Sequence, residues 1–301
     1  MVMLKNSQCP SCGGSNVSFC FNCIDHSVSL QEFAIWACND CTLRFTKDAP
    51  GQNEITGYYR SEAYVSHTDS QKGLINRIYH VVRNFTMQNK RRLVKKVAQK
   101  YTGSLLDIGA GTGSFLKTMK DAGWEVLGLE PDDETRERAS QLHQLQLLPS
   151  ESLFNVQQKY DVITMWHVLE HVHQLHEYLA KIESLLFPGG TLIIAVPNYT
   201  SFDGRHYRQD WAAYDVPRHL YHFSPKAMKR LLSTHGMMIE DHKPMWFDAF
   251  YVSMLTEKYK RRFLGLIRAM LTGAISNIPA IFDPRKCSSV IYIVKKESNR
   301  S

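Results

Sequence analysis

The chain has 301 residues, of which 44% are hydrophobic and 22% are charged. These fractions are ordinary for a globular protein and exclude a mainly disordered chain or a fibrous rod. The net charge of +7 comes from residues 51–100, which hold ten basic and three acidic side chains. No uncharged apolar run reaches the length of a spanning helix, and the N-terminus lacks a signal-peptide core. We therefore expect a cytoplasmic protein without a transmembrane segment.

Residues 1–50 hold six of the seven cysteines, arranged as three Cys-x-x-Cys pairs. In a cytoplasmic chain this spacing indicates metal binding rather than disulfides. The segment predicts a zinc ribbon in which four thiolates hold one structural zinc ion. The expected ligands are Cys9, Cys12, Cys38 and Cys41. The string CPSCGG favours this set, because its glycines allow a tight knuckle. Cys20 and Cys23 stay ambiguous, since pairing them with the last pair also gives a workable spacing.

Residues 51–100 form a linker, with a basic helix expected from about Gly73 to Lys100. The favoured interpretation is an amphipathic surface helix. Its expected packing positions are Leu74, Ile78, Val81, Val82 and Phe85. The alternative is an RNA contact, because clustered basic residues are the electrostatic footprint of nucleic-acid binding.

From residue 101 to 301, apolar strand-like runs alternate with helical stretches, which predicts an α/β domain built on a parallel sheet. Strands are expected at 104–108, 125–129, 146–148 (weak), 161–165, 191–196, 237–243 and 290–294. Helices are expected up to 122 and over 134–142, 175–186 and 225–235. A mostly helical insertion is expected over about 248–284. Within it, residues 257–270 favour a lid or a dimer contact, with a membrane-surface helix as the alternative.

A glycine-rich loop follows the first of these strands, in the string LLDIGAGTG. Glycines at alternate positions allow a sharp turn and let a ligand lie against the backbone. Glu130 ends the next strand, where a carboxylate can accept the hydroxyls of a ribose. The dinucleotide fingerprint needs a glycine where Ser114 stands. The loop therefore favours the compact methionyl end of S-adenosylmethionine over a pyrophosphate.

The string WHVLEHV leaves the carboxyl end of the strand at 161–165, the edge where ligands bind in open parallel sheets. His167 is expected closest to the reacting atoms. Glu170 and His171 follow at helical spacing and could share its side of a turn. The alternative is that these two only tie the turn together by hydrogen bonds.

Four strings together, LLDIGAGTG, GLEPDD, YDVITMWHVLEHV and LFPGGTLIIAVPN, resemble the class I S-adenosylmethionine-dependent methyltransferases. The resemblance spans roughly residues 101–247 and 287–296. It implies a Rossmann-like seven-stranded sheet with a final antiparallel strand. The cofactor-binding residues it implies are Asp107, Gly109, Ala110, Gly111, Gly113, Glu130, Ser150, Trp166 and His167. A Cys-rich segment before such a core is similar to the sugar C-methyltransferases and to an uncharacterised bacterial group.

In such relatives the segment at 202–223, FDGRHYRQDWAAYDVPRHLYHF, lines the acceptor pocket. Methyl transfer to a hydroxyl or an acidic carbon requires proton removal, so a base is needed. The candidate catalytic residues are His167, His219, Tyr214 and His222, with His219 preferred. Arg218 is a candidate for holding an acidic substrate.

The sequence thus predicts a zinc-containing methyltransferase that acts on a small molecule at oxygen or carbon. One alternative is an RNA base methyltransferase that holds RNA with the zinc ribbon and the basic linker. The other is a catalytically silent methyltransferase fold that serves as a scaffold. The intact glycines and Glu130 count against the scaffold.

Overall fold

The computed structural model describes residues 8–59 and 74–297, and the side chains of 8–59 and 85–297. The chain folds into two compact units that do not follow chain order. The first unit combines Met1–His67, Leu169–His176 and Ala195–Tyr292, and the second combines Thr68–Val168, Glu177–Ile194 and Ile293–Ser301. The division at residues 50 and 100 stays a prediction.

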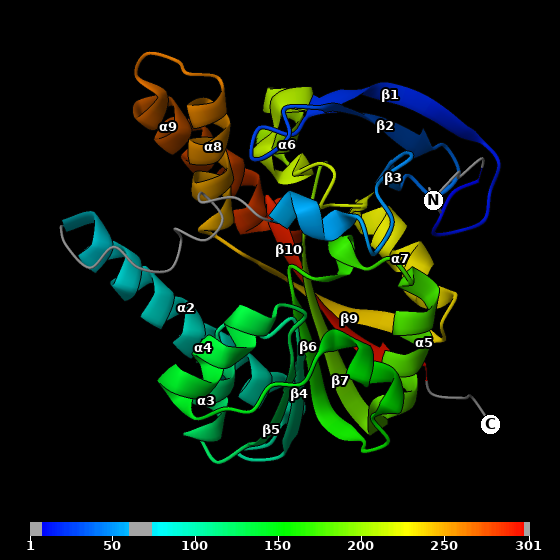
Figure 1. Cartoon of the computed structure of the whole chain (residues 1–301), viewed down its shortest axis with the longest axis vertical. Helices are drawn as coiled ribbons and strands as arrows, with labels where there is room; N and C mark the ends of the chain where they lie inside the picture. The colour runs from blue at the N-terminus through cyan, green and yellow to red at the C-terminus, as the bar shows by residue number, and fades with distance from the viewer. Residues whose placement is uncertain (1–7, 60–73, 298–301) are drawn as a thin grey trace. The chain divides into compact units, whose positions relative to one another are not determined.

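The main sheet has the strand order β5-β4-β6-β7-β10-β9 in the described part of the chain. Its strands are β4 (Ser104–Ile108), β5 (Glu125–Leu129), β6 (Tyr160–Trp166), β7 (Leu186–Pro197), β9 (Met237–Pro244) and β10 (Ser289–Lys296). Strand β4 pairs in parallel with both β5 and β6, and all five of its side chains are buried. The expected α/β, Rossmann-like architecture is confirmed (Figure 1).

The strand expected at 146–148 is reduced to a single parallel bridge between Leu129 and Leu148. Strand β7 begins earlier than expected and includes the Pro188-Gly189-Gly190 string. The helices are α2 (Leu74–Ala98), α3 (Ser114–Lys120), α4 (Asp133–His143), α5 (Leu175–Leu185), α6 (Phe202–Tyr207), α7 (Pro225–Ser233), α8 (Asp248–Tyr259) and α9 (Gly265–Phe282). The 3-10 helices are η1 (Ile55–Tyr59), η3 (Ser150–Asn155), η4 (Leu169–His171), η5 (Arg208–Asp210), η6 (Ala212–Tyr214) and η7 (Pro284–Lys286).

Local capping explains where two of these helices begin. The Asp132 side chain accepts a hydrogen bond from the Thr135 N–H at the start of α4, and Ser224 accepts one from Ala227 at the start of α7. Such caps satisfy backbone donors that have no partner within the helix. Pro225 at the first turn of α7 has the backbone angle that a helix start needs.

The basic helix expected at 73–100 is present as α2. Of its predicted packing positions, only Phe85 lies among the described side chains, and it is 51% exposed. Val94, which lies nearer the C-terminal end of α2, is fully buried. The helical insertion is also present, as α8 and α9. In the described part of the chain, α9 is the one helix that is long and apolar enough to cross a membrane by length and composition, with 28% of it buried.

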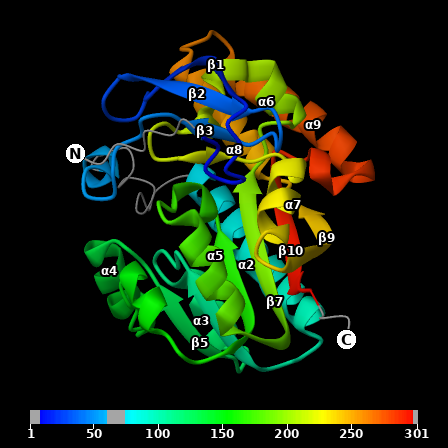
Figure 2. The same ribbon diagram turned by 90° about the vertical axis from the view of Figure 1, so that its right-hand side faces the viewer.

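A second sheet, in the first unit, has the order β1-β2-β3-β8. Its strands are β1 (Val17–Ile24), β2 (Glu32–Cys38), β3 (Arg44–Thr46) and β8 (Tyr221–His222). Figures 1 and 2 show β1 and β2 as a long antiparallel hairpin. Strand β3 pairs with β8 through Arg44 with His222 and Phe45 with Tyr221. The Cys-rich segment (residues 8–50) is therefore continued by a strand from the 202–223 segment.

Candidate functional site

The glycine loop (residues 109–113) holds three glycines at left-handed φ angles of +72°, +54° and +75° for Gly109, Gly111 and Gly113. A Cβ on Gly109 would lie 2.3 Å from Val168, and one on Gly113 would lie 2.9 Å from Leu145. A Cβ on Gly111 would meet nothing within 4 Å. Two glycines therefore allow close packing, while Gly111 faces open space where a ligand can approach the backbone.

Glu130 lies beside this open position. Its Oε2 accepts a hydrogen bond from the Gly111 N–H at 2.8 Å, and its Oε1 accepts one from the Asp132 N–H at 3.2 Å. Burial raises the pKa of Glu130 above its ordinary value, although these two hydrogen bonds oppose the shift. Each carboxylate oxygen keeps acceptor capacity for a further donor. The carboxylate is thus placed to accept hydroxyl groups, as the predicted ribose contact requires.

The Asp107 side chain is buried inside the fold rather than exposed at the surface. Its Oδ1 accepts a hydrogen bond from the Thr164 hydroxyl of β6 at 2.5 Å, and it is 2% exposed. Burial raises the pKa of Asp107 to about 7, against the opposing effects of Thr164 and the positive charge of Lys90. The Lys90 ammonium also lies 4.2 Å from the Trp166 ring centroid. Lys90 was not predicted, because its sequence position shows only a charge within a basic helix.

Trp166 and His167 stand at the end of β6. The Trp166 ring meets Phe115 edge to face, with centroids 5.7 Å apart. His167 has a φ of +57°, an uncommon angle for a residue with a side chain. Ser150 begins η3, two residues after the Leu148 bridge. All nine predicted cofactor residues therefore belong to one compact unit, the second.

The first unit holds a histidine cluster, which we define as Glu170, His171 and His219. One ligand atom from each lies within 4.8 Å of the others. The two imidazole rings meet edge to face with centroids 4.5 Å apart. The Glu170 carbonyl accepts a hydrogen bond from the Leu220 N–H at 2.8 Å, which ties η4 to the 202–223 segment. The pairing of Glu170 and His171 with His219 was not predicted.

The hydrogen bonds of the two histidines define their tautomers. His219 Nδ1 lies 2.9 Å from the Ala213 carbonyl, and His171 Nδ1 lies 3.0 Å from the Arg218 carbonyl. Because a carbonyl can only accept, both Nδ1 atoms carry hydrogen and both Nε2 atoms are left as acceptors. Burial, with the neighbouring His219, lowers the pKa of His171 to about 4. A pKa this low makes His171 a weak base, so His219 is the ring of this cluster that can take a proton, and with the Glu170 carboxylate the cluster can also contact a divalent cation.

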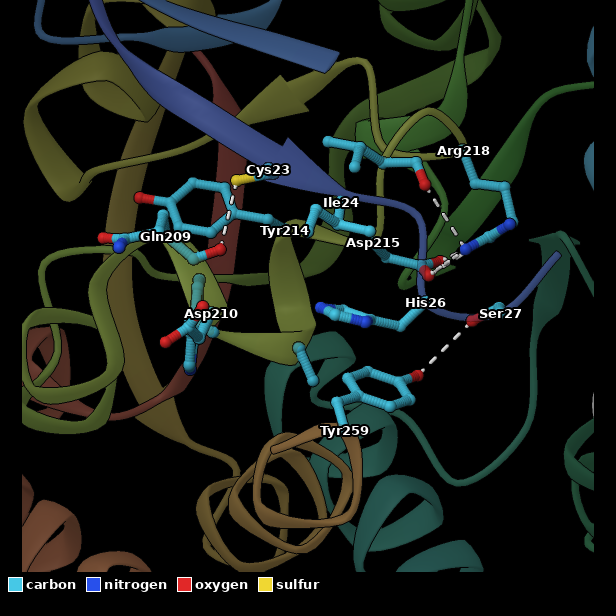
Figure 3. A pocket seen from close by; sticks show the side chains of 13 residues that line it. Cys23, Ile24, His26, Ser27, Gln209, Asp210, Tyr214, Asp215, Arg218 and Tyr259 are labelled. Carbon is cyan, nitrogen blue, oxygen red and sulfur yellow. Dashed lines mark hydrogen bonds and ion pairs between the residues drawn. The ribbon is translucent and has the colours of Figure 1, made fainter. Parts of the chain in front are cut away.

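Arg218 does not fit the predicted role of holding an acidic substrate. Its guanidinium is already paired with Asp215 at 2.6 Å and Asp25 at 3.0 Å, and donates to the Tyr58 carbonyl at 2.9 Å. The side chain is 2% exposed. Figure 3 shows the bonds between Arg218 and Asp215 in the lining of a pocket. In the same pocket the Tyr259 hydroxyl forms a hydrogen bond with the Ser27 hydroxyl. The ion pairs instead fix the backbone beside His219.

Tyr214 and His222 lie in a buried network rather than in an open pocket. The Tyr214 hydroxyl accepts a hydrogen bond from Arg44 at 2.6 Å, and burial raises the pKa of this phenol. His222 Nε2 lies 3.2 Å from the Thr46 hydroxyl, and burial lowers the pKa of His222 well below its ordinary value. His219 is buried as well, at 9% exposed, but belongs to the histidine cluster instead of this network.

The Cys-rich segment contacts the backbone of His219 directly. The Thr46 hydroxyl at the end of β3 donates a hydrogen bond to the His219 carbonyl at 2.7 Å. The Thr46 N–H donates to the Leu220 carbonyl at 3.0 Å. From η1, the Tyr59 hydroxyl lies 3.0 Å from His171 Nδ1. Residues 8–59 therefore help to position the histidine cluster.

Four thiols meet at one end of the Cys-rich segment, from the four cysteines predicted as metal ligands. The Sγ atoms of Cys9 and Cys41 are 3.5 Å apart, and those of Cys12 and Cys38 are 3.6 Å apart. Zinc–sulfur bonds of about 2.3 Å in a tetrahedron require sulfurs roughly 3.8 Å apart. The four sulfurs thus fit a single tetrahedral zinc ion.

Cys20 and Cys23 stand in β1, outside this four-thiol group. They pack around Tyr214 and Trp211, and the Cys23 thiol lies 3.3 Å from the Gln209 carbonyl. Burial raises the pKa of Cys23 to about 12, so its thiol stays protonated. This placement matches side chains that fill a core.

Comparison with known proteins identifies the family and the fold. The family model described as "Methyltransferase domain" matches residues 80–242. A ubiquinone biosynthesis O-methyltransferase from Chelativorans sp. is 26% identical over 175 residues, which cover 52% of this chain and 65% of that protein. One from Mesorhizobium japonicum is 27% identical over 162 residues, covering 48% and 63%. The chain thus spans less than two thirds of the length of these relatives.

Among solved structures, the magnesium protoporphyrin IX methyltransferase of Synechocystis with bound SAH has a TM-score of 0.51 and 15% identity. The match covers 80% of this chain and 97% of that one, and it shows the same fold. Because the family model spans more than half of the residues, the chain belongs to the methyltransferase domain family.

Proposed function

We propose that this chain transfers a methyl group from S-adenosylmethionine to an oxygen or an activated carbon of a small-molecule acceptor. One observation carries the proposal. Gly111 faces open space at a left-handed φ, and its N–H is held by the Glu130 carboxylate at 2.8 Å. A backbone that a ligand can approach, beside a buried acceptor for hydroxyl groups, fits an adenosyl cofactor.

Bound S-adenosylmethionine supplies an electrophilic methyl group on a sulfonium sulfur. The glycine loop would lie against its methionyl part and Glu130 would accept its ribose hydroxyls, while Trp166, His167 and Ser150 complete the proposed set. Asp107 is buried and bonded to Thr164, so we assign it to holding the loop between β4 and β6. The chain's own contribution here is orientation, because a fixed geometry lowers the entropic part of the barrier.

On the acceptor side, we propose His219 as the general base. Its Nδ1 is held by the Ala213 carbonyl, and its Nε2, which lies 3.9 Å from the Asp215 carboxylate, is the atom proposed to take a proton from the acceptor. His167, at the end of β6, is the second proposed base for this reaction.

A small acceptor is supported by the names of the O-methyltransferase relatives. The RNA alternative rests on the basic helix α2. Part of that charge lies against aromatic rings, with Lys90 4.2 Å from the Trp166 centroid and Lys95 6.0 Å from that of Tyr101. We also propose a structural zinc ion on the four-thiol group, and a cytoplasmic location where such thiols stay reduced.

The proposal is tested by titrating S-adenosylmethionine into the purified chain in a calorimeter, followed by transfer of a radiolabelled methyl group. The acceptor panel contains phenols, carbon acids and unmodified RNA. Cofactor binding together with methylated phenol or carbon acid supports the proposal. Methylated RNA alone supports the RNA alternative, and cofactor binding without turnover on any acceptor supports the scaffold.

The role of His219 is tested with His219→Gln. We expect kcat to fall by about 10²–10⁴, the usual contribution of a general base, while cofactor affinity is unchanged. His206→Gln is the matched control, because His206 lies in the same segment, is exposed, and has ring contacts with its neighbours Phe202 and Tyr207 rather than with the histidine cluster. Equal activity of the two variants would exclude His219 as the base.

A further inference from the structure

Helix α9 presents its small residues to the protein and its bulky apolar residues to the outside. Its buried positions are Ala269, Thr272, Gly273, Ser276 and Ala280. Its exposed positions, between 44% and 85% exposed, are Leu266, Ile267, Met270, Leu271, Ile275, Ile278, Ile281 and Phe282. A surface helix of a globular protein normally has the opposite arrangement. A contiguous apolar face of this kind marks an interaction surface.

The helix cannot simply roll to bury this face, because its small face is fixed. A Cβ on Gly273 would lie 2.9 Å from the Cα of Phe250, so α9 and α8 approach at backbone distance. The Ser276 hydroxyl donates to the Asp203 carboxylate at 2.6 Å, and Asn277 donates to the Trp246 carbonyl at 2.8 Å. The pairing of α8 with α9 is visible in Figure 1.

The hairpin formed by these two helices carries further exposed aromatic side chains outside α9. Phe263, in the turn between them, is 88% exposed, and Trp246 and Tyr251 on the α8 side are 41% and 46% exposed. We define the hairpin face as these side chains together with the exposed positions of α9. Aromatic side chains of this amphipathic kind are enriched where a protein meets the boundary of a bilayer.

Charge indicates what covers this face. Residues 258–282 contain five basic side chains and no acidic one. Lys258, Arg261 and Arg268 are exposed at the end of the hairpin where the chain turns. A second copy of the chain would bring the same positive charges together, whereas anionic lipid headgroups complement them. We propose that the hairpin face docks this protein on the surface of an anionic bilayer.

In this arrangement α9 lies in the plane of the interface and does not span the bilayer. One face stays attached to α8 through Gly273 and to Asp203 through Ser276. Arg268 stands within the first turns of the helix, where it reaches the headgroup region when the helix lies flat. The exposed face then enters the boundary between headgroups and acyl chains, and the basic side chains remain among the headgroups.

The test is sedimentation of the full chain with vesicles of phosphatidylcholine alone or mixed with phosphatidylglycerol. We expect at least about tenfold tighter binding to the anionic vesicles, weakened by added salt, since each basic residue contributes about 1 kcal/mol near such a surface. Leu271→Glu with Ile278→Glu should reduce binding at least about tenfold, because two charges enter an apolar region. The matched control is Leu142→Glu on α4, where the side chain is 65% exposed.

A second pair of variants tests the charge separately. Arg261→Gln with Arg268→Gln should lower binding to anionic vesicles, while Lys229→Gln with Arg230→Gln on the exposed side of α7 should not. Absence of vesicle binding by the unaltered chain overturns the proposal, as does equal binding to neutral vesicles. A dimer in sedimentation velocity that Leu271→Glu with Ile278→Glu converts to monomer, without vesicle binding, would assign the face to a second copy instead.

Discussion

The glycine loop and the histidine cluster hold their functional atoms by different physical means. The glycine loop is shaped mainly by the left-handed backbone angles of its glycines. The loop and the Glu130 carboxylate beside it come from one short stretch of chain, 107–130. The histidine cluster is gathered from distant segments and fixed by buried hydrogen bonds and ion pairs from residues 8–59. A loop of the first kind depends on a few glycines. A cluster of the second kind depends on every segment that contributes to it.

The largest expected effect comes from removing the proposed zinc ion, which should affect the histidine cluster and leave the glycine loop unchanged. Cys38→Ser removes one of four cysteine thiols at the end of β2. Strand β2 pairs with β3, whose Thr46 hydroxyl donates a hydrogen bond to the His219 carbonyl. Structural zinc contributes about 10–16 kcal/mol to such folds, so losing it should disorder this sheet. We expect one zinc ion per chain before the change and none after it, with methyl transfer lost and cofactor affinity kept. Metal analysis and calorimetry measure both.

Cys20→Ser is the matched control for this prediction, because Cys20 lies in the same sheet but outside the four-thiol group. It should keep its zinc ion and its activity. If Cys20→Ser also loses the metal, the ligand set is different. If Cys38→Ser loses cofactor binding as well, the glycine loop depends on the Cys-rich segment and the contrast between the two regions fails.

The variant Gly111→Arg changes the glycine loop and leaves the histidine cluster unaltered. Its side chain fills the open space beside Gly111. We expect cofactor affinity to fall by at least about a hundredfold, or about 2.7 kcal/mol. Gly236→Arg is the control, since Gly236 has a similar φ of +61° and also has nothing within 4 Å of an added Cβ. Both variants introduce the same backbone strain, of about 1–2 kcal/mol. Equal loss of affinity in both would mean that strain, not ligand space, is responsible.

Arg218→Met is expected to act on stability rather than on cofactor affinity, because it leaves Asp25 buried without its cation. Breaking a buried pair in this way typically costs about 3–5 kcal/mol. Lys100→Met is the comparison, because Lys100 pairs with Asp161 but is 54% exposed, and such surface pairs contribute about 1 kcal/mol or less. Urea denaturation measures both variants. Similar losses would show that the Arg218 pairs do not stabilise the cluster more than a surface pair does.

The two regions also differ in how far the sequence could predict them. The bounds of β4 and β5 were predicted to the residue, because apolar runs end there at glycines or at an acidic residue. The loop glycines and Glu130, which are proposed to hold the cofactor, follow from the same local pattern, whereas Ser150, Trp166 and His167 were added by the family resemblance. The Arg218–Asp25 pair joins positions 193 residues apart, and both are charged types that are normally exposed. No local pattern marks such a pair, since only the fold decides which charges become buried together.

Local sequence patterns also could not predict the pairing of β3 with β8 or the buried face of α9. Strand β8 has two residues, too short for a periodic pattern, yet it joins the 202–223 segment to the Cys-rich segment. The composition of α9 predicted a helix, but not which of its faces would be buried. That choice depends on the close approach of Gly273 to Phe250, which is a tertiary contact.

The smallest expected effect is a pH dependence of stability that comes from His171. Its pKa is lowered to about 4 in the folded chain, against an unfolded value of about 6.5. Between these values the unfolded chain binds a proton that the folded chain does not, so stability falls as the pH is lowered through this window. From pH 7 to pH 5, we expect this residue alone to cost about 2 kcal/mol.

His171→Gln should therefore lose less stability between pH 7 and pH 5 than the unaltered chain, by about that amount. Urea denaturation at both pH values gives the difference, and acid effects from other groups, such as His222, cancel because both proteins contain them. His206→Gln, at an exposed position, should retain the full acid sensitivity. Parallel stability curves for His171→Gln and the unaltered chain would show that His171 is not held neutral in the cluster, and the assignment of its Nε2 as an acceptor would then fail.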